Sequence, residues 1–232
     1  MARAVWVTGD LNETVVDSIL QDPELDAASF PILTSGFDYA PQTCKFGFDK
    51  YTVLAPRDWH KITTCLVYFP STEREEPPRQ KITGSEIVLS PVICNSALGG
   101  KPWKQPVPDW IIPWLVAMQQ SKHLSKLYWS LVAFSRGASW GLEVSAHVSI
   151  FFDRAVLMAP YMQNRWSDYD KDQMVSRLKI ISNNLLMVYG SEDYQPCNWL
   201  KQVGRVGIEQ LIVQGLGHKA LFNYCIDNYW NI

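Results

Sequence analysis

The stretch "LVAFSRGASWGLEVSA" (residues 131–146) changes character at a single residue. Up to Phe134 it is an apolar run typical of a strand, and beyond that residue the pattern is typical of a helix. Ser135 stands at the change, with Ala133 two residues before it and Gly137 two residues after it. A sharp strand-to-helix turn needs small residues at both flanking positions, because larger side chains would collide across it. The stretch therefore predicts a strand–turn–helix corner with the Ser135 hydroxyl at its tip.

The overall composition is that of a folded protein. The chain has 232 residues, of which 47% are hydrophobic and 19% charged, so it has enough apolar surface for a full core. The net charge of −2 provides no basic field for nucleic acid, which we do not expect as a partner. The first apolar run is too short for a signal peptide, and no run of about 18 apolar residues predicts a transmembrane segment.

The cysteines and histidines show no pattern typical of a metal site. The five cysteines are scattered and include no C-x-x-C pair, so a disulfide framework is not expected. We accordingly expect a reducing, cytoplasmic setting. The four histidines share no ligand spacing with one another or with the cysteines, and we expect no bound metal.

Short apolar runs alternate with helical patterns from about residue 50 onward. This alternation predicts an α/β fold with a mostly parallel sheet of about seven to eight strands, helices on both faces and no large lid. The expected strands lie within residues 50–56, 63–70, 86–93, 127–135, 154–160, 185–190 and 209–215, and the expected helices within residues 109–126, 138–150, 170–181 and 218–231.

The N-terminal part of the chain lacks this regular pattern. Residues 12–21 have helical spacing, but residues 26–42 contain turn formers and show no clear period. We therefore expect residues 1–45 to form an N-terminal extension packed on the core, and residues 46–232 to form one domain. Residues 71–81 are polar and contain prolines, which predicts a solvated loop.

The strand ends carry the residues needed to activate a serine. A serine hydroxyl becomes a nucleophile when a histidine takes its proton and a carboxylate orients that histidine. Asp193 follows the strand at 185–190, and His218 follows the last strand in a glycine-rich loop. The chain order Ser135, Asp193, His218 is the one typical of α/β-hydrolases. Glu192 is an alternative acid, although the G-x-x-D spacing from Gly190 favours Asp193.

From about Lys50 to its end, the chain resembles the α/β-hydrolase superfamily, most of all the compact phospholipase/carboxylesterase and dienelactone-hydrolase-like branch. The resemblance rests on "CLVYFP", "VLSPV", "AFSRGASWG", "RAVLMAPY", "YGSED" and "GLGH". It implies Ser135 as nucleophile, Asp193 as acid and His218 as base. The implied reaction is hydrolysis of a small-molecule carboxylic ester or thioester through an acyl-serine intermediate, without a cofactor.

Two positions depart from the family pattern. Ala133 replaces the usual first glycine of the G-x-S-x-G turn, and Pro70 with Ser71 replaces a His-Gly pair that commonly supplies a backbone N–H to the oxyanion hole. Proline has no N–H to donate. We therefore expect the backbone N–H of Arg136 to be one oxyanion donor and that of Ser71 or Thr72 to be the second.

Each of these assignments has a structural alternative: Asp193 as a turn residue and His218 as a structural histidine in a glycine-rich turn. Ser135 is also a good helix N-cap residue, and the change at Pro70 favours a second hypothesis, a non-catalytic α/β-hydrolase-like binding protein with a degenerate oxyanion hole. A distance below about 3.2 Å between His218 Nε2 and Ser135 Oγ, with Asp193 at the other ring nitrogen, would favour catalysis.

Two more side chains are candidates for contact with a substrate, Trp103 and Arg136. Most of the ten tryptophans are expected in the core. Trp103, in the irregular segment after the strand at 86–93, is a candidate for the wall of an acyl or alcohol pocket. The Arg136 side chain is expected either on the surface, orienting acidic substrates, or in a salt bridge on the helix face.

Overall fold

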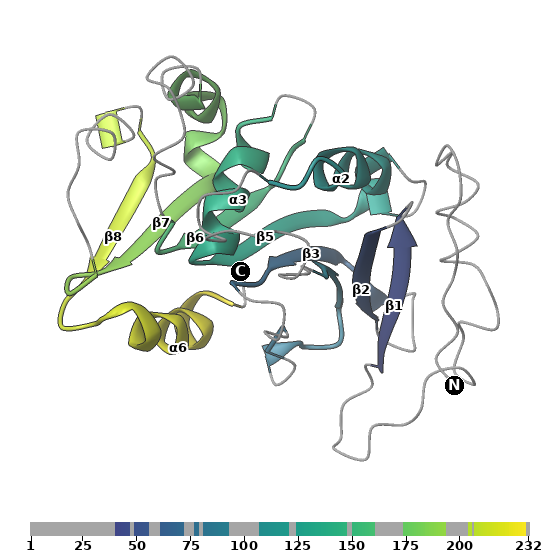
Figure 1. The fold of residues 1–232 in the computed structure, drawn as a ribbon, viewed down its shortest axis with the longest axis horizontal. Helices are drawn as coiled ribbons and strands as arrows, with labels where there is room; N and C mark the ends of the chain where they lie inside the picture. The colour runs from purple at the N-terminus through teal and green to yellow at the C-terminus, as the bar shows by residue number, and fades with distance from the viewer. Residues whose placement is uncertain are drawn as a thin grey trace.

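The computed structural model describes residues 40–46, 49–55, 61–71, 77–78, 81–92, 107–120, 124–147, 150–160, 174–193, 204–205 and 207–230. In these ranges the chain forms one eight-stranded sheet with helices on both of its faces (Figure 1). No helix in them is long and apolar enough to span a bilayer.

The sheet has the strand order β1-β2-β4-β3-β5-β6-β7-β8. The strands β1 and β2 pair antiparallel, as do β2 and β4, and the other five pairs are parallel. Their bounds are β1 Ala40–Phe46, β2 Asp49–Ala55, β3 Thr64–Phe69, β4 Glu86–Pro91, β5 Tyr128–Phe134, β6 Arg154–Met158, β7 Leu185–Gly190 and β8 Glu209–Val213.

Helices cover both faces of this sheet (Figure 1). The helices α2 (Ile111–Gln120) and α3 (Arg136–Ser145) lie on one face, and α6 (His218–Tyr229) lies on the other. Two short 3₁₀ helices, η5 (Leu124–Lys126) and η6 (Lys179–Asn184), precede β5 and β7. The arrangement confirms the predicted α/β class and the mostly parallel sheet.

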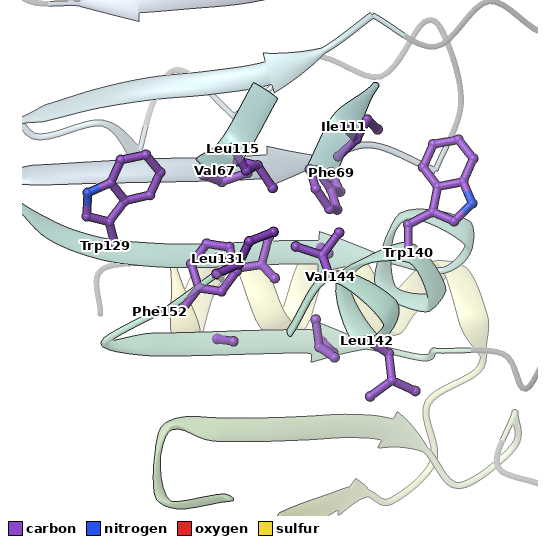
Figure 2. Close-up of a cluster of buried hydrophobic side chains, with 14 of the residues drawn as sticks. Val67, Phe69, Ile111, Leu115, Trp129, Leu131, Trp140, Leu142, Val144 and Phe152 are labelled. Carbon is purple, nitrogen blue, oxygen red and sulfur yellow. The ribbon is translucent and has the colours of Figure 1, made fainter. Parts of the chain in front are cut away.

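Alternate residues of the central strands feed two separate cores. In β3, Val67 and Phe69 pack toward α2 and α3, whereas Leu66 and Tyr68 pack toward α6. This is the two-residue period of a strand buried on both faces. Figure 2 shows the first core, with Trp140 of α3 near the carboxyl end of β3. Because both cores are apolar, the sheet is a fixed platform for the loops that follow its strands.

Strand β1 is the main difference from the sequence prediction. Residues 26–42 show turn formers and no period, yet β1 begins at Ala40 and pairs with β2 along its whole length. A two-residue connection joins the strands, and β1 is the edge of the sheet, where Pro41 is tolerated. The sheet thus starts before the boundary that we placed at residue 46. Residues 1–39 lie outside the described ranges, so their packing stays a prediction.

Candidate active site

The candidate site lies where the strand order reverses. From β3 the chain first adds β4 on one side and then β5 on the other side. In open parallel sheets such a reversal opens a crevice at the carboxyl ends of the two strands. Ser135 directly follows β5, and Pro70 and Ser71 directly follow β3. The sequence-predicted nucleophile and the predicted oxyanion segment therefore follow two strands that are parallel neighbours in the sheet.

Ser135 occupies the sharp corner that the sequence predicts. Its φ of 54° and ψ of −114° put a non-glycine residue in the left-handed half of φ space. Such backbone costs about 1–3 kcal/mol and persists only where the surroundings enforce it. The Ser135 N–H donates to the Met158 carbonyl at 2.8 Å, and the Ser139 N–H donates to the Ser135 carbonyl at 3.1 Å. The corner is thus held by strand β6 on one side and by helix α3 on the other.

The N-cap alternative for Ser135 does not describe its side chain. Ser135 precedes the first residue of α3, but its hydroxyl makes no capping hydrogen bond to the helix. The Oγ atom lies instead 2.8 Å from His218 Nε2. The hydroxyl is therefore directed at an imidazole and away from the orphan N–H groups of α3.

Small residues let the corner pack, as the sequence indicated. A Cβ atom at Gly137 would lie only 2.2 Å from the Phe69 carbonyl oxygen and 2.7 Å from that of Pro70. The backbone that leaves β3 thus touches the first turn of α3. Ala133 is accommodated because α3 carries Gly141 opposite it: a Cβ at Gly141 would lie 3.3 Å from that of Ala133.

Asp193 and His218 complete a hydrogen-bonded chain to Ser135. His218 is the first residue of α6, and Asp193 lies three residues beyond β7. The His218 Nδ1 atom lies 2.5 Å from Asp193 Oδ2, while Nε2 lies 2.8 Å from Ser135 Oγ. A carboxylate oxygen can only accept, so this geometry suits the neutral imidazole tautomer with its proton on Nδ1, in which Nε2 accepts the hydroxyl proton. This meets the geometric criterion set for catalysis.

Glu192, the alternative acid, occupies a different position. It is exposed, and its Oε2 lies 3.4 Å from the point where a Gly217 Cβ would stand. The hydrogen bond at His218 Nδ1 is made by Asp193. The spacing argument that favoured Asp193 over Glu192 therefore agrees with the geometry.

Phe134 was not identified from the sequence, where it is only the last apolar residue of a strand. Its ring centroid lies 4.8 Å from that of His218 and 4.8 Å from that of Phe222, one turn further along α6. Phe134 is nearly buried, so it forms an apolar support beneath the imidazole. No local signal in the sequence marks such a contact, because it joins segments more than eighty residues apart.

The Arg136 side chain is buried, which contradicts the expectation of a surface cation that orients acidic substrates. It is only 6% exposed, and its guanidinium carbon lies 5.3 Å from the centre of the Trp140 ring. Trp140 is four residues further along α3, on the same helix face, and is completely buried. The cation–π contact therefore holds Arg136 inward against the helix.

Of the three residues expected to donate to the oxyanion hole, Arg136 and Ser71 lie within the described ranges. The Arg136 N–H belongs to the first turn of α3, where backbone N–H groups have no acceptor within the helix. Ser71 is half-buried and follows Pro70, whose carbonyl faces Gly137. Thr72 and Trp103 lie outside the described residues. Within the described ranges, no group of three or more His, Cys, Asp or Glu residues is arranged to hold a metal ion.

Solved structures with this architecture share its fold at low sequence identity. The S-formylglutathione hydrolase from Staphylococcus aureus has a TM-score of 0.57 at 15% identity, over 84% of this chain and 96% of its own. The peroxisomal alpha-beta-hydrolase from Saccharomyces cerevisiae has a TM-score of 0.59 at 9% identity, over 84% and 87%. The chain has the α/β-hydrolase fold.

The thioesterase domain from the curacin biosynthetic pathway is a third structure with a similar fold. Its TM-score is 0.55 at 10% identity, over 82% of this chain and 96% of that domain. No protein-family model matches the sequence. No curated protein matches it either. The α/β-hydrolase fold predicted from short motifs is thus confirmed by structure, where overall sequence comparison finds nothing.

Proposed function

We propose that this chain is a serine hydrolase that cleaves a carboxylic ester or thioester through an acyl-serine intermediate. The observation that carries the proposal is the chain of two hydrogen bonds from Ser135 through His218 to Asp193, with distances of 2.8 and 2.5 Å. Three residues from three separate strand ends converge in the arrangement that activates a serine hydroxyl.

The proposed reaction proceeds in two halves. Ser135 Oγ attacks the carbonyl carbon while its proton passes to His218 Nε2, and Asp193 stabilises the imidazolium that forms. The tetrahedral intermediate expels the alcohol or thiol, which takes the proton from His218. Water then attacks the acyl-serine and gives a proton to His218, which passes it to Ser135 Oγ as the carboxylic acid is released.

Negative charge on the substrate oxygen in this reaction needs donors preset in the site. We assign one to the Arg136 N–H and the other to the N–H of Ser71 or Thr72. Each such donor contributes roughly 3 kcal/mol to transition-state stabilisation. The supporting observation is that the Phe69 and Pro70 carbonyls lie against Gly137. This contact keeps the chain that leaves β3 beside Ser135.

A fluorophosphonate probe tests the proposal because it modifies an activated serine irreversibly. We expect the wild-type protein to be labelled at Ser135 and the Ser135→Ala variant to remain unlabelled. Ser139, on the next turn of α3, provides a matched control, since its Oγ bonds the Ser135 carbonyl. Ser139→Ala should still be labelled. Labelling that survives Ser135→Ala would refute the assignment.

Substrate range is the next measurement. A series of p-nitrophenyl esters with short to long acyl chains, together with the matching thioesters, compares small-ester esterase, lysophospholipase-like and thioesterase activities. We expect turnover of at least one ester class that disappears in Ser135→Ala.

The second candidate is a binding protein that keeps the fold without turnover. The observation that favours it is Pro70, which has no N–H for the oxyanion hole. It predicts that the protein binds acyl esters and that neither hydrolysis nor probe labelling occurs. The intact hydrogen-bonded chain at His218 favours the hydrolase, because a binding role does not need it.

A further inference from the structure

The loops that carry Asp193 and His218 are joined to each other by their backbones. We name residues 190–193 the acid loop and residues 213–217 the base loop; each begins at the last residue of a strand, β7 and β8, and these strands are neighbours in the sheet (Figure 1). The Ser191 N–H donates to the Val213 carbonyl at 2.9 Å, and the Glu192 N–H donates to the Leu216 carbonyl at 3.1 Å. The acid loop thus pairs with both ends of the base loop.

Gly190 brings the two loops into direct contact. A Cβ atom at this position would lie 2.0 Å from the Leu216 carbonyl oxygen and 2.8 Å from its carbonyl carbon. Real Cβ atoms do not approach backbone so closely, so only glycine permits this spacing. The separation of the loops, and with it the separation of Asp193 from His218, is therefore set locally and not only by the sheet.

The middle of the base loop has little packing to hold it. Gly215 has a φ of +74°, is exposed, and would place a Cβ with no atom within 4 Å. Its N–H donates to Ser191 Oγ at 2.9 Å. The two hydrogen bonds given above join backbone groups, whereas this one is accepted by the Ser191 side chain. A single substitution of Ser191 can therefore remove it and leave the backbone groups in place.

We propose that Ser191 is a positioning residue that fixes the base loop against the acid loop and thereby maintains the hydrogen bond between His218 and Asp193. The inference rests on the proposed function, because the aligned pair matters for turnover only if His218 is the base. Ser191 acts through the loop: its N–H holds Val213 and its Oγ holds Gly215, three residues before His218. It does not contact the reacting atoms.

The test compares Ser191→Ala, which removes the acceptor, with Ser191→Thr, which retains an Oγ. One neutral hydrogen bond corresponds to about a three- to tenfold change in rate. We expect Ser191→Ala to lower kcat by that factor with KM within twofold, and Ser191→Thr to restore most of it. Ser85→Ala is the matched control, because that hydroxyl bonds Thr83 in a loop at the amino end of β4; its kcat should equal that of the wild type.

A second readout does not depend on turnover. The proton on His218 Nδ1, bound to Asp193, gives a downfield NMR resonance, which Ser191→Ala should broaden or lose and Ser191→Thr should keep. If Ser191→Ala preserves both kcat and this resonance, the inference is wrong. If the wild-type protein is neither active nor labelled by fluorophosphonate, the proposed function fails, while the resonance still decides whether Ser191 aligns the pair.

Discussion

Gly137→Ala tests whether the chain that leaves β3 forms a wall of the site. The new methyl carbon would lie 2.2 Å from the Phe69 carbonyl oxygen, and both this atom and the Pro70 oxygen at 2.7 Å belong to backbone that cannot rotate away. To restore a contact of 3.0 Å, α3 and the β3 loop must separate by about 0.8 Å. Displacements near 1 Å cost on the order of 10²-fold in rate. We expect kcat to fall by that factor.

Gly141→Ala is the matched control for this substitution. It adds the same methyl group four residues along the same helix, but its nearest contact, at 2.7 Å, is with the tip of the Leu157 side chain, which can move, and its contact with the Ala133 Cβ at 3.3 Å needs a shift of only a few tenths of an ångström. We expect kcat within threefold of the wild type and a change in thermal stability of about 1–3 kcal/mol from overpacking. Ester turnover, probe-labelling rate and thermal unfolding are measured for both variants. If folded Gly137→Ala keeps wild-type kcat, the backbone after β3 does not shape the site.

Three further predictions concern the acid, the oxyanion hole and the cysteines. Asp193→Asn should lower kcat by on the order of 10⁴, because the neutral amide can donate its NH₂ to His218 Nδ1, which leaves the ring proton on Nε2, and it no longer stabilises the imidazolium charge; Glu192→Gln should stay within about threefold, and the reverse order would make Glu192 the acid. Ser71→Pro should lower kcat by about 10²–10³-fold if this N–H is the second donor, and Ser71→Ala should do much less; equal turnover of folded Ser71→Pro and wild type would shift the assignment to another residue. Burial raises the pKa of the Cys225 thiol to about 12 and that of Cys65 well above its ordinary value, so both thiols stay protonated at pH 8. Iodoacetamide followed by mass spectrometry should find both unmodified until urea unfolds the protein; modification under native conditions would contradict their burial.

The candidate site could be proposed from the sequence where each signal is local. The corner at Ser135 is marked by its small neighbours, and Asp193 and His218 each follow an apolar run within a few residues. Because the carboxyl ends of parallel strands meet at one edge of a sheet, three local signals were enough to predict a shared site. The distances between the side chains of Ser135, His218 and Asp193 then follow from the arrangement of the strands. The prediction needed no sequence signal that links distant segments.

Contacts between distant segments could not be predicted in this way. Two such contacts are the close approach of Gly190 to Leu216 and the ring contact of Phe134 with His218. In neither case does a local sequence pattern indicate that the two segments meet. The burial of Arg136 depends on Trp140, whereas the usual expectation for an arginine is exposure. Strand β1 was missed for a related reason: an edge strand pairs on one side only, so its sequence is free to carry turn formers.

Pro70 removes one backbone N–H from the candidate site but does not change the position of the chain beside Ser135. The wall beside the nucleophile depends on contacts of the Phe69 and Pro70 carbonyls with Gly137, and a proline supplies its carbonyl as well as any residue. What proline lacks is the N–H, so the replacement changes the number of available donors and not the position of the wall. This explains how a changed oxyanion sequence coexists with a hydrogen-bonded Ser135, His218 and Asp193. Under the proposed function, oxyanion binding and activation of Ser135 are then separable: probe labelling should report mainly the activation of Ser135, whereas ester turnover should require both.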